Sequence, residues 1–525
     1  MSVMFNKLLV ANRGEIAVRV IQACREVGIS TVALYTRSEA GALHARLADE
    51  CVLLDSPAGF SDQAAILSIA EHQKADAIHP GYGFLAERPG FALACEERGI
   101  AFIGPPADVM EPLFCKLKTL ERVNQAGFPT VLFSASSFPG TENAADLYQE
   151  VDRLGYPVVI KACHGGRGLG EYLVRTPGRL ENAIRRAQAA AQAAFGDPRI
   201  YLERAIFPFH QIGVQVIGDR YGQMIHLGER ESLFLSGNRK LIEESPAPSL
   251  EPEQRELLWQ TALEIARLFN YQNVGTIEFL VDSAGRFYFT EIKARIQLEH
   301  PLTEMVARVD LVGEQIRIAA GKPMTYRQAE LRRHGWAMLS RIRAEDPWRR
   351  LLPSPGIIQS VRLPAGPDTR IDTYLNAGCS IPTEYDPLIA KLTVWGEDRK
   401  TCRGRMRRAL QEFLLVGVPT NIPLIQQILS TAGFTGGRYN KEFSIQQTDM
   451  DPLDKNSSRN FKQDLTPDLM RDLQRDLPRD LPRDLPRDLA VAAAILYAYR
   501  SQVTHPENRG RTPGGRQRNN RRWRP

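Results

Sequence analysis

The chain has 525 residues, of which 43% are hydrophobic and 24% are charged, a balance that is ordinary for a globular protein of roughly two to four domains. No apolar run reaches the roughly 18 residues that indicate a membrane-spanning helix, so a membrane role is not expected. The formal net charge is +6, but seven arginines fall in the last 17 residues. The rest of the chain is therefore close to neutral, which argues against nucleic-acid binding by its folded part.

The seven cysteines are scattered along the sequence, and none forms a CxxC pair. Neither a zinc site nor a dithiol redox motif is therefore predicted, and free thiols in a reducing compartment are the simplest interpretation. The start of the chain has only a short apolar stretch, which is unlike a signal peptide. We therefore expect a cytoplasmic protein.

Residues 1–115 alternate between strand patterns and helix patterns. The runs KLLVAN and STVALYT predict buried strands, and EIAVRVIQACREVG between them has apolar residues at helical spacing. The run AFIGPP predicts another strand. Such alternation is typical of a parallel sheet covered by helices on both faces, so we expect a Rossmann-like α/β domain here.

Residues 116–330 predict an α+β domain rich in antiparallel strands. The strand YPVVIKA leads into a glycine-rich stretch, CHGGRGLG, and an alanine-rich helix pattern follows. Later come a helix pattern over PEQRELLWQTALEIARLF and the strands GTIEFLVD and RFYFTEI. Residues 331–447 predict a small strand-rich domain closed by the helix RGRMRRALQEFLL.

The remaining sequence differs in composition. Within residues 448–489 aspartate recurs every four residues from Asp464 to Asp488, mostly as RDLP, and a proline in every turn prevents a continuous helix. We expect an extended or disordered spacer there. Residues 490–525 predict one short helix and a disordered arginine-rich tail, which is either a solvated run of charge or a docking segment for an acidic partner or RNA.

Two glutamates on neighbouring predicted strands form the first candidate site. Glu278 lies in GTIEFL and Glu291 in FYFTEI, so adjacent strands could direct both carboxylates at one point. Magnesium prefers hard oxygen ligands and usually keeps water and phosphate oxygens as well. The pair therefore predicts a magnesium site, although two solvent-facing strand positions would give the same pattern.

A second candidate site lies in RIQLEHPLTE, which spans residues 295–304. Arg295, Gln297 and Glu299 alternate there, and an extended backbone would place all three on one face. The arginine offers a forked pair of donors to a small oxyanion, and the glutamate can remove a proton as a general base.

Three strings occur in a fixed order: ANRGEIAVR at residues 11–19, HPGYGFLAE at 79–87 and RIQLEHPLTE at 295–304. Their order and spacing resemble the biotin carboxylases, including the corresponding domains of acetyl-CoA, propionyl-CoA and pyruvate carboxylases. The resemblance covers roughly residues 4–445 and is strengthened by RAEDP, LLPSPG and YDPLIAKL. It implies an ATP-grasp fold and an enzyme that uses ATP and bicarbonate to carboxylate biotin on a separate carrier protein.

The resemblance also implies roles for individual residues. In the reaction itself these are the base Glu299, the bicarbonate ligands Lys240, Arg295, Gln297 and the Leu298 backbone, the enolate-stabilising Arg341, and Tyr82 near the biotin ring. For ATP they are Lys116 and Lys161 at the phosphates, Gly165 and Gly166 in a glycine-rich lid, Glu203 at the adenine amine, Arg204 in place of the usual lysine, and Ile206, Leu280 and Val418 against the adenine. For Mg²⁺ or Mn²⁺ they are Glu278 and Glu291. Such a lid would exclude water while an unstable carboxyphosphate forms.

Several positions depart from the family pattern, mostly on the nucleotide side. Lys293 stands where the family has an asparagine beside the metal, and its ammonium would compete with magnesium for the two glutamates. The other departures are Arg167, Leu169 and Glu171 in the lid, and Gln211, Gly213, Leu235 and Asn238. The family has a histidine at the position of Gln211, and the neighbouring His210 could take its role. Two interpretations stay open: a divergent but active enzyme, which the retained residues favour, and a paralogue with weak or no ATP turnover that acts as a structural or regulatory carboxylase partner.

The sequence contains no biotin-attachment motif of the Met-Lys-Met kind and no carboxyltransferase-like region after the third domain. The expected partners are therefore a separate biotin carboxyl carrier protein and carboxyltransferase subunits, as in the acetyl-CoA carboxylase of fatty acid biosynthesis. Because the family is commonly dimeric, we also expect a homodimer; nucleic acid is expected only through the basic tail. Other ATP-grasp ligases, which join carboxylates to amines, would not carry HPGYGFL together with RIQLEHP.

Overall fold

The computed structural model describes residues 4–139, 144–165, 172–235, 239–349, 351–437 and 439. All of them belong to one unit, Met1–Asp449, while the second unit, Met450–Pro525, lies wholly outside the described residues. The spacer, the short helix and the basic tail therefore remain predictions. Among the helices of the described part, none has the length and apolar character that a bilayer span requires.

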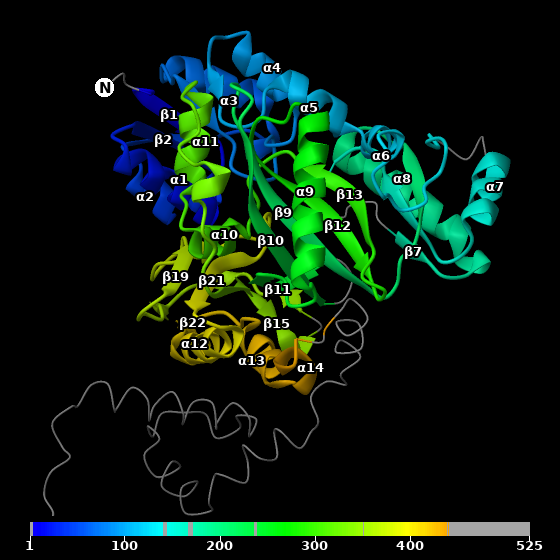
Figure 1. Cartoon of the computed structure of the whole chain (residues 1–525). Helices are drawn as coiled ribbons and strands as arrows, with labels where there is room; N and C mark the ends of the chain where they lie inside the picture. Colours follow the sequence, from blue (N-terminus) through cyan, green and yellow to red (C-terminus); the bar gives the residue numbers. More distant parts are fainter. Residues whose placement is uncertain are drawn as a thin grey trace, which may run out of the picture. The chain divides into compact units, whose positions relative to one another are not determined.

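A parallel five-stranded sheet forms the N-terminal layer, with the strand order β3-β2-β1-β4-β5 (Figure 1). Its strands are β1 (Lys7–Val10), β2 (Ser30–Tyr35), β3 (Glu50–Leu53), β4 (Ala77–His79) and β5 (Ala101–Phe102). The helices of this region are α1 (Gly14–Glu26), α2 (Leu43–Leu47), α3 (Gln63–His72), α4 (Pro89–Glu96), α5 (Ala107–Phe114) and α6 (Lys116–Gln125). Successive side chains of a strand point to opposite faces, so Leu9 joins one hydrophobic core while Leu8 and Val10 join another. The predicted Rossmann-like domain is confirmed.

The strand order of this sheet reverses at β1, which pairs with both β2 and β4. Ligands of such sheets bind beyond the carboxyl ends of the strands at the point of reversal. Asn12 follows β1 and donates from Nδ2 to the carbonyl oxygens of Pro80, at 2.6 Å, and Tyr82, at 2.9 Å. Gly81 between them has a φ of +60°, and a Cβ there would lie 2.8 Å from Asn12 Nδ2, so the turn requires glycine. This turn fixes the position of Tyr82.

An eight-stranded antiparallel sheet follows, in the order β13-β12-β9-β10-β11-β14-β21-β19. Its strands are β9 (Phe209–Gly218), β10 (Met224–Leu235), β11 (Arg239–Ser245), β12 (Asn273–Asp282), β13 (Phe287–Lys293), β14 (Trp336–Arg343), β19 (Thr369–Thr373) and β21 (Leu388–Gly396). Helix α9 (Pro252–Leu268) crosses this sheet and buries Leu258, Ala262 and Ile265, which recur at helical spacing (Figure 1). Because β11 pairs with β14, the strand-rich C-terminal region continues the sheet of the central region.

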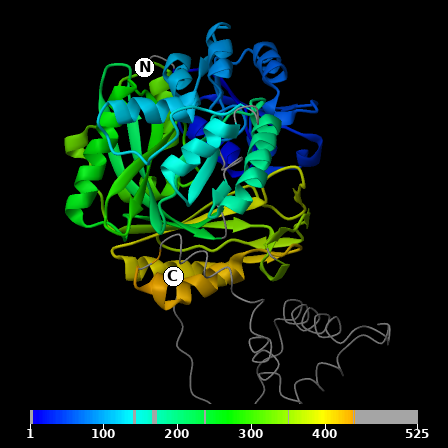
Figure 2. The same cartoon turned by 90° about the vertical axis from the view of Figure 1, so that its right-hand side faces the viewer.

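A smaller subdomain carries the glycine-rich stretch. Its antiparallel sheet, in the order β7-β6-β8, is formed by β6 (Val158–Ala162), β7 (Tyr172–Val174) and β8 (Ile200–Arg204). Helices α7 (Ala144–Leu154) and α8 (Leu180–Phe195) accompany it. The subdomain has a hydrophobic core of its own, and Figure 2 brings it to the front of the molecule. Residues 166–171, which connect β6 to β7, lie outside the described residues.

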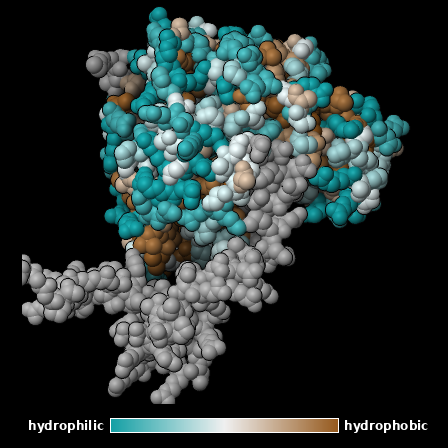
Figure 3. All heavy atoms as spheres, turned by 60° about the horizontal axis from the view of Figure 1, so that its bottom comes forward, coloured by the Kyte–Doolittle hydropathy of each residue, from teal (hydrophilic) through white to brown (hydrophobic). Residues whose placement is uncertain are grey.

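The C-terminal region ends in helices rather than in a single closing helix. The predicted helix is α12 (Arg399–Glu412), and α13 (Ile422–Ser430) and α14 (Ala432–Thr435) follow it. The remaining helices are α10 (His300–Ala307) and α11 (Leu311–Ala319), and the short paired strands are β15 (Glu345–Asp346) with β16 (Leu352–Pro353), β17 (Gly356–Ile357) with β20 (Ser380–Ile381), and β18 (Ser360–Arg362) with β22 (Leu414–Val416). The face in Figure 3 is mainly hydrophilic with a few hydrophobic patches.

Candidate active site

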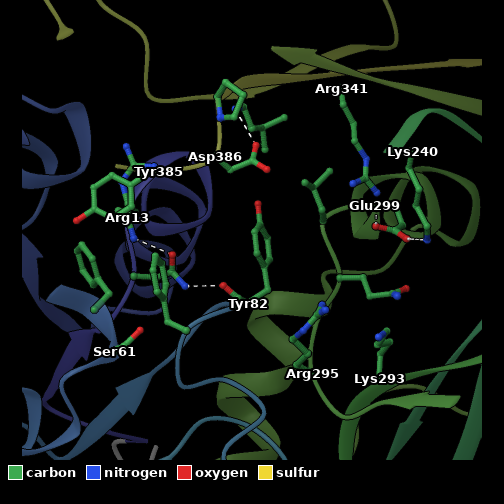
Figure 4. Close-up of a pocket in the computed structure, with 18 of the residues that line it drawn as sticks. Arg13, Ser61, Tyr82, Lys240, Lys293, Arg295, Glu299, Arg341, Tyr385 and Asp386 are labelled. Carbon is green, nitrogen blue, oxygen red and sulfur yellow. Dashed lines mark hydrogen bonds and ion pairs between the residues drawn. The ribbon is translucent and has the colours of Figure 1, made fainter. Parts of the chain in front are cut away.

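A cavity of about 1070 Å³ lies between the three regions. In Figure 4, Lys240, Arg295, Glu299 and Arg341 lie on one side of it, and Tyr82 stands near the middle. The residues that the sequence proposed for the site and that line this cavity are Tyr82, Lys161, Glu203, Arg204, Ile206, Lys240, Glu278, Leu280, Glu291, Arg295, Gln297, Leu298, Glu299 and Arg341. Residues that lie far apart in the sequence therefore face one space.

Three proposed residues lie elsewhere. Lys116 and Gly165 line a much smaller adjoining cavity of about 40 Å³, which shares Glu291 with the main one. Val418 is buried in the core of the C-terminal region and is absent from the cavity lining, and its contact with adenine stays a prediction. Gly166 lies outside the described residues.

The segment that carries the proposed base is a loop, so the one-face arrangement expected of an extended backbone is not what brings its side chains together. Strand β13 ends at Lys293, opposite Thr276 of β12. Glu299 is the residue before α10, and its φ of −80° and ψ of 7° are not those of a strand. Pro301 lies in the first turn of that helix, where its fixed φ favours helix initiation. Arg295, Gln297 and Glu299 nevertheless all line the cavity, because the loop wraps around it.

Glu299 lies between two cations. Its carboxylate accepts from Lys240 Nζ at 2.9 Å and from Arg341 Nη2 at 3.0 Å. Burial raises the pKa of Glu299, but the charges of Lys240 and Arg341 outweigh burial and leave the pKa below its ordinary value. The group is therefore an ionised carboxylate that can accept a proton once a substrate draws these cations away.

Arg341 is oriented by Glu243, a residue that the sequence analysis missed. Glu243 accepts from Arg341 Nε at 3.0 Å and from Nη2 at 2.5 Å, and it is fully buried. Such a two-point contact fixes the plane of the guanidinium. The acidic pair in KLIEES could have indicated this residue in the sequence, because adjacent strand residues face opposite sides and each buried carboxylate needs its own partner. Glu243 contacts Arg341, and Glu244 contacts Arg399.

Gln297 is held by a second residue that the sequence analysis missed, the fully buried Arg230. Arg230 Nη2 donates to Gln297 Oε1 at 2.7 Å, while Gln297 Nε2 donates to Glu278 Oε1 at 2.6 Å. Arg230 also donates to Gln215 and Thr303 at 2.7 and 2.6 Å. This network fixes the amide orientation of Gln297 toward the cavity.

Arg295 is anchored by the second sequence motif. Its Nε donates to Glu87 Oε2 at 3.0 Å, and Glu87 is the last residue of HPGYGFLAE. Tyr82 of the same motif lines the cavity, and its buried hydroxyl has no hydrogen-bond partner in the described part of the chain. An unpartnered buried hydroxyl is costly unless a ligand satisfies it, so Tyr82 is well placed to meet one.

The two strand glutamates are direct partners across β12 and β13, with Glu278 opposite Glu291. Both side chains line the cavity, as a shared magnesium site requires. In the described residues no third carboxylate, histidine or cysteine completes a protein-only metal site. Two carboxylates still suit Mg²⁺, which takes its other ligands from phosphate oxygens and water.

Lys293 restricts one half of this pair. Its Nζ lies 2.7 Å from Glu291 Oε2, because residues two apart on a strand point to the same face. Burial lowers the pKa of Lys293, but the charges of Glu291 and Glu87 outweigh burial and raise it, so the ammonium is charged. Lys293 therefore occupies the position at Glu291 from which it would compete with magnesium, as the sequence suggested.

The proposed nucleotide side combines apolar and charged groups. Ile206 and Leu280 line the cavity, while Lys161 Nζ lies 2.8 Å from Glu203 Oε2. Arg204 also lines the cavity, and its Nη1 donates to the Leu154 carbonyl oxygen at 2.5 Å. Apolar side chains combined with a few placed polar groups suit a purine base.

The departures at residues 210–213 have distinct environments. Gln211 Nε2 donates to Glu278 Oε2 at 2.9 Å, and His210 Nδ1 lies 2.6 Å from Glu231 Oε1. A Cβ at Gly213 would lie 2.9 Å from Thr276 Cγ2, so a larger residue would need Thr276 to shift. Asn238, Arg167, Leu169, Glu171 and the side chain of Leu235 lie outside the described residues.

His79, at the end of β4, makes the stability of this region depend on pH. Burial and the charge of Arg19 lower the pKa of His79 to about 3, and its Nδ1 accepts from Gly81 N–H at 3.0 Å. The unfolded histidine binds a proton near pH 6.5, whereas the buried histidine stays neutral until about pH 3. The contribution of neutral His79 to the free energy of unfolding is therefore full above pH 6.5 and is lost as the pH falls toward 3. In His79→Asn, whose Oδ1 can still accept from Gly81, we expect the loss of unfolding free energy between pH 6.5 and 5 to be smaller by about 2 kcal/mol. Urea unfolding at several pH values tests this; parallel curves for the two proteins would contradict it.

Three known protein families match successive parts of the chain. Residues 4–110 match the family "Biotin carboxylase, N-terminal domain", residues 116–327 match "Carbamoyl-phosphate synthase L chain, ATP binding domain", and residues 340–445 match "Biotin carboxylase C-terminal domain". Biotin carboxylase 1 of Bacillus subtilis is 43% identical over 444 residues, which cover 84% of this chain and 98% of the relative. The chain belongs to the biotin carboxylase family.

Other relatives in this family serve different carboxylases. A pyruvate carboxylase subunit of Methanothermobacter thermautotrophicus is 42% identical over 84% of this chain and 89% of its own. The biotin carboxylase domain dimer of Hydrogenobacter thermophilus 2-oxoglutarate carboxylase, solved with MgADP, ADP and bicarbonate, has a TM-score of 0.81 and is 41% identical over 84% of this chain and 97% of its own. An ATP-complex structure of the Campylobacter jejuni biotin carboxylase also has a TM-score of 0.81, with 36% identity over 84% of this chain and 99% of its own.

Proposed function

We propose that this protein is a biotin carboxylase that uses ATP and bicarbonate to carboxylate biotin on a separate carrier protein. The observation that carries the proposal is the contact of Glu299 with both Lys240 and Arg341 in the shared cavity. A base held between two cations suits a reaction in which an anion must be bound, deprotonated and then replaced by an enolate.

In the first step, bicarbonate binds to Lys240 and Arg295, and Glu299 removes its proton. A bicarbonate oxygen then attacks the γ-phosphorus of ATP, which releases ADP and forms carboxyphosphate. Lys161 and Lys116 bind the phosphates, and Glu278 and Glu291 form the acidic pair at which the magnesium ion would bind. The ion would offset phosphate charge. Ile206 and Leu280 form the apolar surface against which the adenine ring packs.

In the second step, carboxyphosphate breaks down to CO₂ and phosphate, and the phosphate takes the N1 proton of biotin. Arg341 then stabilises the biotin enolate by charge, and the N1 atom forms the new bond to CO₂. Glu243 fixes the orientation of the Arg341 guanidinium for this role. Its carboxylate accepts from Nε and Nη2, so the N–H groups that it does not bind are the ones that can face the enolate. Tyr82 packs beside the ring.

The partners proposed for this reaction are a biotin carboxyl carrier protein and carboxyltransferase subunits. Relatives include subunits of pyruvate and 2-oxoglutarate carboxylases, so the final acceptor of the carboxyl group is a property of the transferase that assembles with the chain. The solved relative from Hydrogenobacter thermophilus is a dimer, which supports a homodimer here.

The deciding experiment measures ATP hydrolysis by the purified protein with magnesium and bicarbonate, with and without free biotin. We expect hydrolysis that requires bicarbonate and that rises when biotin is added. A folded protein that binds ATP but shows no bicarbonate-dependent hydrolysis would refute the proposal and support the non-catalytic paralogue. The direct product, carboxybiotin, is followed in parallel by transfer of labelled carbonate.

A further inference from the structure

The ion pair between Lys293 and Glu291 is an interior one. The nitrogen and the oxygen are 2.7 Å apart, and the side chains are only 11% and 23% exposed. Lys116 approaches the same carboxylate, with its Nζ 3.9 Å from Glu291 Oε2. Glu291 therefore lies between two ammonium groups, and pairs with so little solvent are weakly screened.

The partner carboxylate has a different environment. In the described part of the chain, the side chains that donate to Glu278 are neutral amides: Gln211 Nε2 at 2.9 Å and Gln297 Nε2 at 2.6 Å. Lys240 is 3.7 Å from Glu278, but it lies closer to Glu299, at 2.9 Å. The negative charge of Glu278 is therefore compensated less directly than that of Glu291, although the two residues are cross-strand partners.

This asymmetry affects any divalent cation. A cation bound to Glu291 would lie within a few ångströms of the Lys293 ammonium, and like charges at that distance in a poorly solvated site repel strongly. Among the described residues, the Lys240 ammonium is the one that approaches Glu278, at 3.7 Å, so a cation beside Glu278 meets no ammonium in such direct contact with its ligand. An ammonium can itself bind phosphate oxygens as a point charge.

We propose that Lys293 takes the place of a divalent cation on the Glu291 side, so that the site binds a nucleoside triphosphate with a single divalent cation, beside Glu278, and with the lysine as a second, fixed positive charge on the phosphates. The inference rests on the proposed function only in that the nucleotide binds in this cavity. Lys293 is then a residue that determines the metal stoichiometry of the site.

The test counts Mn²⁺ bound per chain in the presence of a non-hydrolysable ATP analogue, from the electron paramagnetic resonance signal of free Mn²⁺. The wild-type protein should bind one Mn²⁺ per nucleotide. Lys293→Asn, which removes the charge and offers an amide oxygen, should bind a second Mn²⁺ at least about tenfold more tightly than the wild type does. Two Mn²⁺ of similar affinity in the wild type, or an unchanged count in the variant, would overturn the inference.

A second measurement separates this role from a merely structural one. In EDTA, without any divalent cation, Lys293→Asn should bind the analogue about tenfold or more weakly, because the phosphates lose the ammonium. Metal affinity and metal-free nucleotide affinity should thus change in opposite directions, whereas a damaged site would weaken both. Weakening of both in a variant with a normal melting temperature would also overturn the inference.

Two variants serve as matched controls. Lys293→Arg keeps the charge and should keep the count of one Mn²⁺; a count of two would contradict the role of charge. Lys400→Asn makes the same substitution at a surface position of α12 and should match the wild type in both measurements. Because binding is measured without turnover, a wild-type protein that binds one Mn²⁺ with the nucleotide but hydrolyses no ATP would refute the proposed function and leave this inference standing.

Discussion

Glu299→Gln should lower the bicarbonate-dependent rate of ATP hydrolysis by at least about 100-fold, the usual contribution of a general base. The amide has nearly the same shape but cannot accept the bicarbonate proton. It also presents an N–H group to Lys240 or Arg341, where the carboxylate accepts from both. The rate is measured at saturating ATP and bicarbonate, so that a change in substrate binding alone does not lower it.

A suitable control for this variant is Glu304→Gln. Glu304 is a buried carboxylate in the same motif, but it pairs with Arg370, at 2.5 Å, and does not line the cavity. We expect its activity per folded molecule to stay within a few-fold of the wild type, even if its melting temperature falls. Near-normal hydrolysis by Glu299→Gln would remove Glu299 from the role of base.

Arg230→Met should lower the free energy of unfolding by about 3–5 kcal/mol, as is typical when one partner of a buried charged network is removed. The guanidinium donates to Gln215, Thr276, Gln297 and Thr303, and methionine can replace none of these hydrogen bonds. The oxygens of Gln215 and Gln297 would be left buried without a donor, which is itself costly. Urea unfolding at neutral pH measures the change.

Arg286→Met provides the comparison for the same substitution at the surface. The Arg286 side chain is 71% exposed and forms a solvent-exposed ion pair with Asp282. Such pairs contribute little, so the free energy of unfolding should change by less than about 1 kcal/mol. If the free energy of unfolding fell no more in Arg230→Met than in Arg286→Met, the buried network would not contribute to stability as its contacts indicate.

Much of the fold could be predicted because its signals are local. The apolar strand of β1 and the helical spacing of α1 depend on neighbouring residues, and both elements occur where the sequence placed them. The loop at residues 294–299 could not be predicted in this way. Alternation in RIQLE suggested an extended backbone, but the pairing of β13 with β12 ends at Lys293, and a segment without a pairing partner gains no ladder hydrogen bonds.

The sequence by itself determined the fold class, the family motifs and which residues carry reactive groups. Only the tertiary structure decided which groups meet: Arg295 contacts Glu87 across 208 residues, and Arg341 contacts Glu243 across 98. It also showed that Lys293 holds Glu291 rather than Glu278, and that Val418 lies in a core. The physical reason is that a buried charge needs a partner but not one nearby in the chain, so the pairing is set by strand order and register.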